Sequence, residues 1–355
     1  MARCVTECFG SGEEFCPAPL TARLGNSGFL RLARLPYNLR PSFHAPKRVK
    51  IITQPHELDP GARKVCLAIG MFDGVHLGHQ QILRQTIEDA RRHEGLAVAT
   101  TFDCHPNSVV APDRNPPLIY SLSQKLRVIK ALGIDATLLI HFDTAFSKKP
   151  GEDFVRELVR DLGPVHSLCV GSAFTFGHRR SGNVELLKLL GSELRFTVHG
   201  LAAVSLDGKV VSSTRIREAI HAGNLDGAGQ MLGRTYSLAG RVMEGDKIGR
   251  QLGFPTANLD VIGLALPPTG VYAAHAHADG GVHQAVVNIG SRPTLQRPQP
   301  RIQVEAHLLD FTGALYGEEL EIAFVEKLRE EQRFPSAEAL QAQIRQDIEK
   351  ARALF

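Results

Sequence analysis

Two histidines, His76 and His79, stand at the start of a predicted helix and could act on a phosphate group. An apolar run over 65–69 predicts a buried parallel strand; two glycines then end it, and a helical pattern begins near Leu77. A helix N-terminus offers free N–H groups and about half a positive charge. Two imidazoles placed there could stabilise charge on an α-phosphate under attack and on leaving pyrophosphate. The pattern predicts a nucleotide-phosphate site.

Other interpretations of this histidine pair compete with the phosphate site. The two residues could cap the helix, pack in the core or supply half of a zinc site. Zinc is disfavoured because the pair has no cysteine or carboxylate companion. Gly78, between the histidines, removes a side chain that would obstruct the close approach of a nucleotide.

A second strand-to-helix junction, 211–218, carries three hydroxyl groups and two arginines within six residues: Ser212, Ser213, Thr214, Arg215 and Arg217. An ordinary Ser/Thr helix cap is the competing interpretation. Several hydroxyl donors with fixed positive charge also suit the β- and γ-phosphates of ATP. A third basic loop, 177–180, is equally compatible with a solvated turn.

The elements that must position these groups alternate between strand and helix from about residue 47 to residue 223. The predicted strands are 65–72, 96–102, 136–142, 167–171 and 195–202, and the predicted helices are 77–93, 121–132, 152–161 and 183–190. This order predicts a doubly wound α/β domain with a mostly parallel sheet, whose ligands bind outside the carboxyl ends of the strands. Because neither a G-x-G-x-x-G fingerprint nor a Walker A loop is present, the histidine turn is the candidate phosphate site.

The rest of the chain predicts a second, smaller domain. Residues 224–233 form a glycine-rich connector, and residues 234–355 follow as a small antiparallel barrel or sandwich. Its predicted strands are 235–243, 270–277, 283–289, 302–308 and 320–325. A last helix, from Ser336 to about Ala353, should pack on the barrel. Residues 1–46, basic and rich in proline and glycine, are expected to form a poorly ordered N-terminal extension.

Composition bounds the class of protein. The 355 residues are enough for two domains, 43% of them are hydrophobic, and no apolar run approaches the roughly 20 residues of a membrane-spanning helix. The net charge of +4 gives weak support for nucleic-acid binding. Six cysteines without a C-x-x-C pair favour reduced thiols. We therefore expect a cytoplasmic protein that binds neither nucleic acid nor membrane, and oligomeric state stays open.

Several motifs resemble the bacterial bifunctional riboflavin kinase/FAD synthetase family. In the first domain they are Gly70-Met-Phe-Asp-Gly-Val-His-Leu-Gly-His79, Thr101-Phe-Asp-Cys-His-Pro106, Phe174-Thr-Phe-Gly-His-Arg179 and Ser212-Ser-Thr-Arg-Ile-Arg217. In the second they are 245–258 (Gly-Asp-Lys-Ile-Gly-Arg-Gln-Leu-Gly-Phe-Pro-Thr-Ala-Asn), Gly270-Val-Tyr272, 288–294 (Asn-Ile-Gly-Ser-Arg-Pro-Thr) and 304–311 (Val-Glu-Ala-His-Leu-Leu-Asp-Phe). They run from about residue 47 to the C-terminus in the family's domain order.

The resemblance implies two reactions. Riboflavin and ATP would give FMN and ADP in the second domain, and FMN and ATP would give FAD and pyrophosphate in the first. For the first domain it implies His76 and His79 as catalytic residues and ATP contacts at Gly70, Phe72, Asp73, Gly78, Ser212, Ser213, Thr214 and Arg217. It implies flavin contacts there at His105, Phe174 and Phe176.

For the kinase domain, the resemblance implies ATP and phosphate contacts at Gly249, Arg250, Gly253, Pro255, Thr256 and Asn258. Thr256 and Asn258 match the family's ligands for Mg²⁺ bound to ATP, and Mg²⁺ prefers oxygen donors. Glu305 matches the catalytic base that takes the proton of the ribityl 5′-hydroxyl. Without the surrounding motifs, Glu305 would be interpreted as a solvated residue on a strand edge.

Two departures from the family's pattern lie in the first domain. Ala173 stands where an Asp usually precedes the Phe-x-Phe-Gly stretch, and Cys104 stands where a Pro is common. Both put flavin affinity at the first site in doubt. A kinase, or a flavin- or nucleotide-binding regulator with an impaired adenylyltransferase site, is therefore the alternative, and a tRNA-acting enzyme with a similar histidine turn is a distant third.

Overall fold

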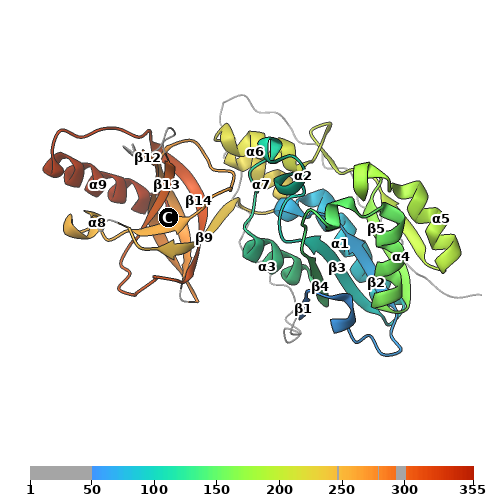
Figure 1. The fold of residues 1–355 in the computed structure, drawn as a ribbon. Coiled ribbons are helices and arrows are strands. Elements are labelled where there is room, and N and C mark those ends of the chain that lie inside the picture. The colour runs from blue at the N-terminus through green and yellow to red at the C-terminus, as the bar shows by residue number, and fades with distance from the viewer. Residues whose placement is uncertain (1–49, 246–247, 279, 293–300) are drawn as a thin grey trace, which may run out of the picture. The chain divides into compact units, whose positions relative to one another are not determined.

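The computed structural model describes residues 50–245, 248–278, 280–292 and 301–355, and Figure 1 labels their elements. The predicted N-terminal extension and parts of two motifs (Asp246, Lys247, Pro293 and Thr294) lie outside these residues.

The first domain contains a six-stranded sheet in which every pair of neighbouring strands is parallel. The strand order is β1 (Lys50–Ile52), β4 (Ala136–Ile140), β3 (Leu96–Phe102), β2 (Val65–Ile69), β5 (Val165–Gly171) and β6 (Thr197–Leu201). The chain order reverses between β2 and β5, which is where ligands of such sheets bind. The predicted parallel sheet is confirmed, and β1 is a strand that the sequence pattern did not indicate.

Helices cover both faces of this sheet because successive residues of its strands point to opposite sides. On β2, Val65, Leu67 and Ile69 pack with side chains of α4 (Gly151–Leu162) and α5 (Val184–Leu194). The alternate residues Cys66 and Ala68 pack with side chains of α1 (Leu77–Arg92) and α3 (Leu122–Leu132). The doubly wound arrangement is confirmed.

The predicted connector over 224–233 is helical for most of its length. After α6 (Ser213–His221), helix α7 spans Leu225–Leu232. The side chain of Asn224 accepts a hydrogen bond from the Gly227 N–H and so caps the helix, while Gly233 ends it in a left-handed conformation. Three glycines predict a loop, but capping and the burial of Met231 and Leu232 outweigh their low helix propensity.

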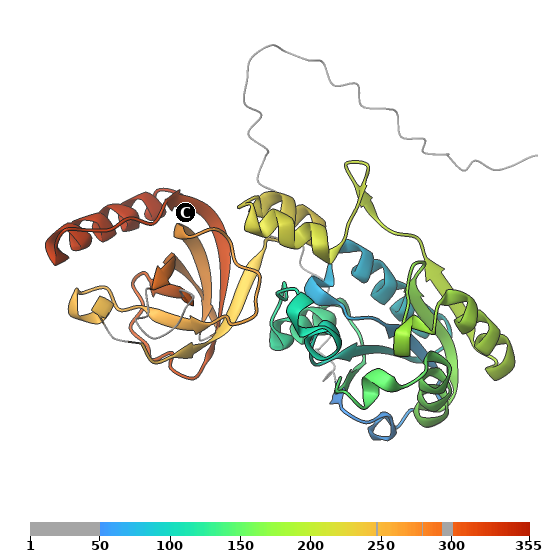
Figure 2. The same ribbon diagram turned by 45° about the horizontal axis from the view of Figure 1, so that its top comes forward.

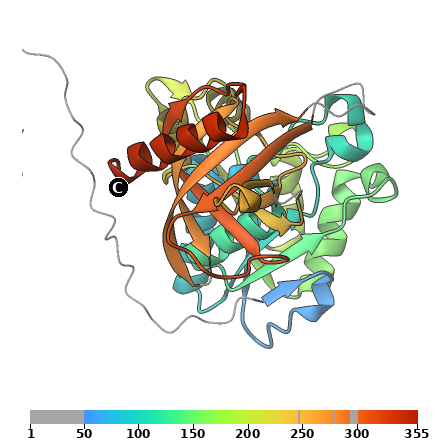
Figure 3. The ribbon, with the colours of Figure 1, turned by 90° about the vertical axis from the view of Figure 1, so that its left-hand side faces the viewer.

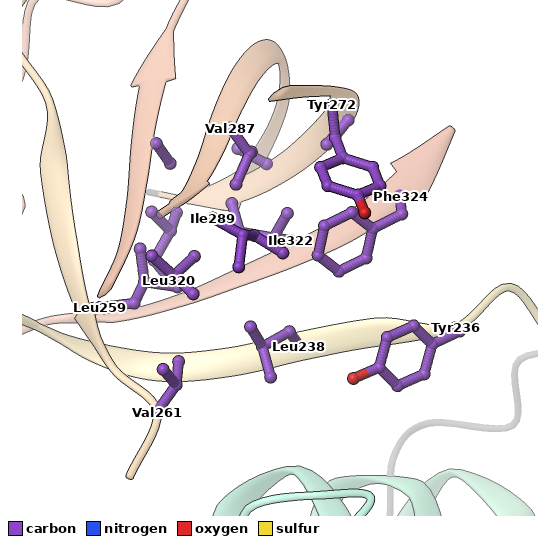
Figure 4. Close-up of a cluster of buried hydrophobic side chains, with 14 of the residues drawn as sticks. Tyr236, Leu238, Leu259, Val261, Tyr272, Val287, Ile289, Leu320, Ile322 and Phe324 are labelled. Carbon is purple, nitrogen blue, oxygen red and sulfur yellow. The ribbon is translucent and has the colours of Figure 1, made fainter. Parts of the chain in front are cut away.

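The sequence predicted either a barrel or a sandwich for the second domain, and the structure shows a closed antiparallel barrel (Figure 2). Its strands, in order around the barrel, are β10 (Ala257–Asp260), β13 (Arg301–Leu308), β12 (Gly281–Arg292), β11 (Gly270–Ala278), β14 (Glu319–Arg329) and β9 (Ser237–Met243). The short strand β10 was not predicted, and it closes the barrel by pairing with both β13 and β9. Figure 4 shows the apolar interior, where the rings of Tyr272 and Phe324 meet edge to face.

The C-terminal helix α9 (Ala337–Arg352) packs on the barrel as predicted (Figure 3). The hydroxyl of Ser336 accepts a hydrogen bond from the Ala339 N–H and caps the helix. Buried Ala351 packs with residues of β11 and β12. The guanidinium of Arg329 forms an ion pair with Asp347, whose side chain is buried, and this pair joins β14 to α9.

Shorter elements complete the described part of the chain. They are the helices α2 (Asn107–Val110) and α8 (Ile248–Gln251), the strands β7 (Ser205–Leu206) and β8 (Lys209–Val210), and five 3₁₀ turns, η1 (Pro55–Glu57), η2 (Asp73–Val75), η3 (Pro112–Arg114), η4 (Phe146–Lys148) and η5 (His178–Arg180). None of the helices over the described ranges is both long and apolar enough to cross a bilayer. Among the described residues, Cys66, Cys104 and Cys169 are free thiols; Cys66 and Cys169 are buried and Cys104 is partly exposed.

Candidate active sites

A strained turn leads from β2 to the histidines. Phe72, Gly74 and Val75 have φ values of 50°, 74° and 41°, all in the left-handed region. A β-branched residue such as Val75 rarely adopts this conformation, and such strain persists only where the surrounding structure enforces it. Directly after it, the His76 Nδ1 accepts a hydrogen bond from the His79 N–H at 3.4 Å, so His76 caps α1.

The two imidazoles stack on each other at the end of the sheet. Their ring centroids are 3.6 Å apart and their planes differ by 19°. The Phe72 ring meets His79 edge to face at 5.4 Å. The Nδ1 atom of His79 is buried and has no hydrogen-bond partner among the described residues, which is unusual for a buried polar atom. A Cβ added to Gly78 would lie 3.2 Å from His76 Cε1, so glycine leaves room for the stack.

Both histidines are neutral at neutral pH. Burial, together with the nearby guanidinium charges of Arg234 and Arg217, lowers the pKa of His76 to about 4. Burial also holds the pKa of His79 well below its usual value, helped by His76. The sequence left open protonated or hydrogen-bonding imidazoles. The structure favours neutral rings that act through hydrogen bonds.

Asp73 brings the two predicted phosphate-binding segments together. Its Oδ2 accepts a hydrogen bond from Arg217 Nη2 at 2.7 Å; the Asp73 side chain is buried and that of Arg217 is 11% exposed. Its backbone carbonyl accepts a hydrogen bond from the Ser213 hydroxyl at 3.1 Å. The N-terminus of α6 therefore lies beside the histidine turn. Ser212 caps α6 by accepting from the Arg215 N–H.

The remaining predicted ATP contacts of this site have protein neighbours of their own. Asp73 Oδ1 accepts hydrogen bonds from the Ile119 and Tyr120 N–H groups. A Cβ on Gly70 would come within 2.8 Å of the Phe72 ring. Thr214 is exposed. Their roles toward ATP remain predictions, and Asp73 has a clear part in holding Arg217.

The predicted flavin contacts fall into two places. Burial, and after it the charge of Arg217, lower the pKa of His105. The rings of Phe174 and Phe176 stack at 5.2 Å, and Phe176 meets Phe154 of the core. Within the described ranges no ring contact joins this pair to the stacked histidines, so their flavin contact stays a prediction.

The barrel contains a second candidate centre around Glu305. Glu305 on β13 lies directly opposite Asn258 on β10 and Asn288 on β12, so three polar residues form one row across neighbouring strands. Glu305 Oε2 accepts a hydrogen bond from the Thr256 hydroxyl at 3.4 Å. The predicted base and the predicted Mg²⁺ ligands are thus brought together, and Asn288 joins them.

Two cavities meet at this row, and Thr256 and Asn258 line both of them. The first, of about 400 Å³, is also lined by Arg250, Pro255 and the segment 311–316. The second, of about 410 Å³, holds Glu305 and has apolar walls that include side chains of α9. The paired cavities can hold two substrates, with Thr256 and Asn258 between them and the carboxylate in the second cavity.

The loop before β10 is tightly built. The Phe254 N–H donates to the Gly249 carbonyl at 2.8 Å, and a Cβ on Gly249 would lie 2.5 Å from the Phe254 oxygen. Gly253 has a φ of 85°, which favours glycine. The Pro255 carbonyl accepts a hydrogen bond from His307 Nδ1 at 2.8 Å. These contacts explain the glycines and fix the approach to Thr256.

Some residues of the second centre were not predicted as site residues. Asn288 stands in a motif that the sequence analysis quoted, but its position opposite Glu305 depends on strand register. Arg329 and Asp347 line the second cavity and are 18 residues apart in sequence. The length and helical pattern of α9 place Asp347 on a helix, and no local signal indicates its partner.

The donor set of the second centre suits magnesium. Thr256, Asn258 and Glu305 supply hydroxyl, amide and carboxylate oxygens, the hard donors that Mg²⁺ prefers when phosphates and waters complete its shell. Over the described ranges, no group of three or more His, Cys, Asp or Glu side chains is arranged to hold a metal by itself. The residues present therefore fit an ion that arrives with a nucleotide.

Comparison with known proteins identifies close relatives. Residues 59–215 match the family model for FAD synthetase, and residues 232–355 match that for riboflavin kinase. The chain is 39% identical over 307 residues to the bifunctional riboflavin kinase/FMN adenylyltransferase of Pseudomonas fluorescens, covering 86% of this chain and 98% of that protein. The corresponding protein of Escherichia coli (strain K12) is 36% identical over 309 residues, with the same coverage. A crystal structure described as a macrolide-efflux protein from Streptococcus pneumoniae is similar in fold, with a TM-score of 0.71 and 27% identity over 86% of this chain and 98% of that chain.

Proposed function

The chain belongs to the family of bifunctional riboflavin kinase/FMN adenylyltransferases, and we propose how its two centres divide the work. The barrel transfers the γ-phosphoryl group of ATP to riboflavin, giving FMN and ADP. The α/β domain transfers the AMP group of a second ATP to FMN, giving FAD and pyrophosphate. Two separate constellations support this division: Asp73 joins the segments of one, and Thr256 and Glu305 lie together in the other.

For adenylyl transfer, we infer that an FMN phosphate oxygen attacks the α-phosphorus and that the bond to pyrophosphate breaks. His76 and His79, as neutral imidazoles, would donate hydrogen bonds to oxygens that gain charge in the transition state. The hydroxyls at the start of α6 and the Arg217 guanidinium would hold the β- and γ-phosphates. Support comes from the contact of α6 with the histidine turn through Asp73.

In the kinase centre, we assign ATP to the first cavity, where Arg250 offers positive charge. Riboflavin would occupy the second cavity, whose apolar walls suit an isoalloxazine ring. The Glu305 carboxylate would take the proton of the ribityl 5′-hydroxyl as its oxygen attacks the γ-phosphorus and ADP departs. Phosphoryl transfer requires mainly alignment and charge neutralisation, so one carboxylate and one Mg²⁺ ion would be sufficient.

We propose that Thr256 and Asn258 hold Mg²⁺ together with phosphate oxygens of ATP. Bound Mg²⁺ would neutralise charge on the phosphates. The Thr256 hydroxyl, through its contact with Glu305, keeps the oxygen donors within one cluster. We also propose a cytoplasmic location, because the three free thiols among the described residues fit a reducing compartment.

A product time course tests the proposal. The purified full chain, given riboflavin, Mg²⁺ and ATP, should accumulate FMN first and FAD afterwards. FMN without FAD would reduce the function to a kinase, in line with the departures at Ala173 and Cys104. Absence of both products would favour a flavin- or nucleotide-binding regulator.

A further inference from the structure

An arginine just beyond α7 binds the turn that carries the histidines. Arg234 Nη1 donates hydrogen bonds to the carbonyls of Val75 at 3.1 Å and Leu232 at 2.9 Å, and Nη2 donates to the carbonyl of Gly74. Its Nε donates to the Tyr120 hydroxyl at 3.0 Å. All three guanidinium nitrogens are therefore engaged, and two of them hold one backbone turn.

The carbonyls that Arg234 binds belong to the strained part of this turn. The peptide groups of Gly74 and Val75 are the last two before His76, and Val75 has the left-handed φ of 41°. Hydrogen bonds to both carbonyls fix the planes of these two peptides. Because the second peptide leads into His76, they also fix the position of the His76 Cα atom, from which the side chain extends. A β-branched residue in this conformation needs such external support.

A buried glutamine, Gln80, also binds the backbone carbonyls of this turn. Gln80 Nε2 donates to the Val75 carbonyl at 3.0 Å and to the Leu232 carbonyl at 2.7 Å, the same two oxygens that Arg234 Nη1 binds. Gln80 lies on α1, one residue after His79. The turn is thus held from its own helix and from a residue 160 positions away from Gly74.

We propose that Arg234 is a positioning residue for adenylyl transfer, and that the histidine turn of the first domain is completed by the first residues of the second. Arg234 lies inside the segment that matches riboflavin kinase, 232–355, and outside the segment that matches FAD synthetase, 59–215. The adenylyltransferase centre therefore depends on a residue that belongs, by sequence, to the kinase. This inference rests on the proposed adenylyl transfer at His76 and His79.

The test uses the full chain with Arg234→Ala and Arg234→Lys. With FMN and ATP, Arg234→Ala should lower kcat for FAD formation by about 10–100-fold while KM for ATP changes less than about threefold, because the histidines are displaced and the phosphate contacts of α6 remain. The kcat of Arg234→Lys for FAD formation should lie between those of wild type and Arg234→Ala, since one ammonium cannot bind two carbonyls and the Tyr120 hydroxyl together. Riboflavin phosphorylation by the same variants should stay within about twofold of wild type.

Two further measurements separate positioning from general destabilisation. Guanidinium chloride at low, non-denaturing concentration should restore part of the FAD formation of Arg234→Ala and none of that lost in His79→Ala. In the double variant Gln80→Leu/Arg234→Ala, the fold loss of kcat for FAD formation should be clearly smaller than the product of the two single fold losses. Both side chains support the same carbonyls, so their effects should not be independent. Arg241→Ala is the matched control: this arginine, on β9, donates to the Gly317 carbonyl within the barrel.

The outcomes are distinct. Wild-type chain that makes no FAD would defeat the proposed function itself. Wild-type chain that makes FAD, together with Arg234→Ala that makes it equally fast, would overturn this inference alone. Equal loss of both reactions without guanidinium rescue would also overturn it, because Arg234 would then support only the fold.

Discussion

Asp73 and Arg217, 144 residues apart, form a buried ion pair with 2.7 Å between Oδ2 and Nη2. Two backbone N–H groups satisfy the other carboxylate oxygen. The pair fixes the N-terminal half of α6 against the histidine turn, so the geometry of the proposed adenylyltransferase centre depends on it.

Asp73→Ala should lower the free energy of unfolding by about 3–5 kcal/mol, because it leaves the Arg217 charge buried without its partner. Urea unfolding of the purified chain measures this. Arg156→Ala is the control. Its ion pairs with Glu152 and Glu193 are solvent-accessible, so its loss should change the free energy of unfolding far less. Similar losses in the two variants would contradict the structural role assigned to Asp73.

His79→Ala should depress FAD formation from FMN by roughly 10²–10³-fold, the effect of losing a donor to a transition-state oxygen. Its buried Nδ1 has no hydrogen-bond partner over the described ranges, so the ring is free to bind a ligand. Steady-state rates of FAD formation and of FMN formation should both be measured, since only FAD formation should fall and FMN formation should be unchanged. Equal loss of both activities would make His79 a structural residue.

Glu305→Gln should stop riboflavin phosphorylation and leave the adenylylation of supplied FMN intact. The amide keeps the size of the side chain but cannot take a proton. Separate assays with riboflavin and with FMN distinguish the two centres. Continued FMN production would show that Glu305 is not the base.

Gly78→Ala tests how closely the imidazoles must be placed. The added Cβ would lie 3.2 Å from His76 Cε1, so the ring must shift by a few tenths of an ångström. We expect kcat for FAD formation to fall by about 10-fold or more. Stability should not fall, because alanine has the higher helix propensity and Gly78 lies in the first turn of α1. A variant with unchanged kcat would show that the site tolerates this shift.

The low pKa of His76 predicts a pH dependence of stability. In the unfolded chain this pKa is about 6.5, and in the folded protein it is about 4. Between these values the unfolded chain binds more protons, so the contribution of His76 is complete above about pH 6.5 and is lost as the pH falls toward 4. Urea unfolding of wild type and His76→Gln over this window should show that wild type loses stability relative to the variant as the pH falls. Parallel curves would mean that His76 titrates normally.

The alternation of strand and helix, and the apolar periods within it, predicted most of the first domain. Strand β3 has the predicted bounds, and both faces of the sheet are covered as expected. Two strands were not predicted because the sequence pattern of a short element is weak. Strand β1 has three residues, and β10 has four residues that follow a loop rich in glycine and proline. Their existence is decided by pairing with distant strands.

Candidate residues of the site can be proposed from the sequence where their chemistry is concentrated in one motif. His76, His79 and Ser213 share a turn or a helix start with other polar groups. The supporting residues could not be found this way: Arg234 looks like an ordinary basic residue directly after the connector, and Asn288 like one polar residue among apolar neighbours. Their partners, Val75 and Glu305, are brought near only by the tertiary fold.

The row of Asn258, Glu305 and Asn288 makes the kinase centre sensitive to insertions. Because side chains alternate between the two faces of a strand, one extra residue in β13 ahead of Glu305 would turn the carboxylate to the opposite face. In a closed barrel a strand cannot slide to correct this without breaking its bonds to both neighbours. We therefore expect length variation among relatives to be confined to the loops, while the residue count of β10, β12 and β13 around this row stays constant.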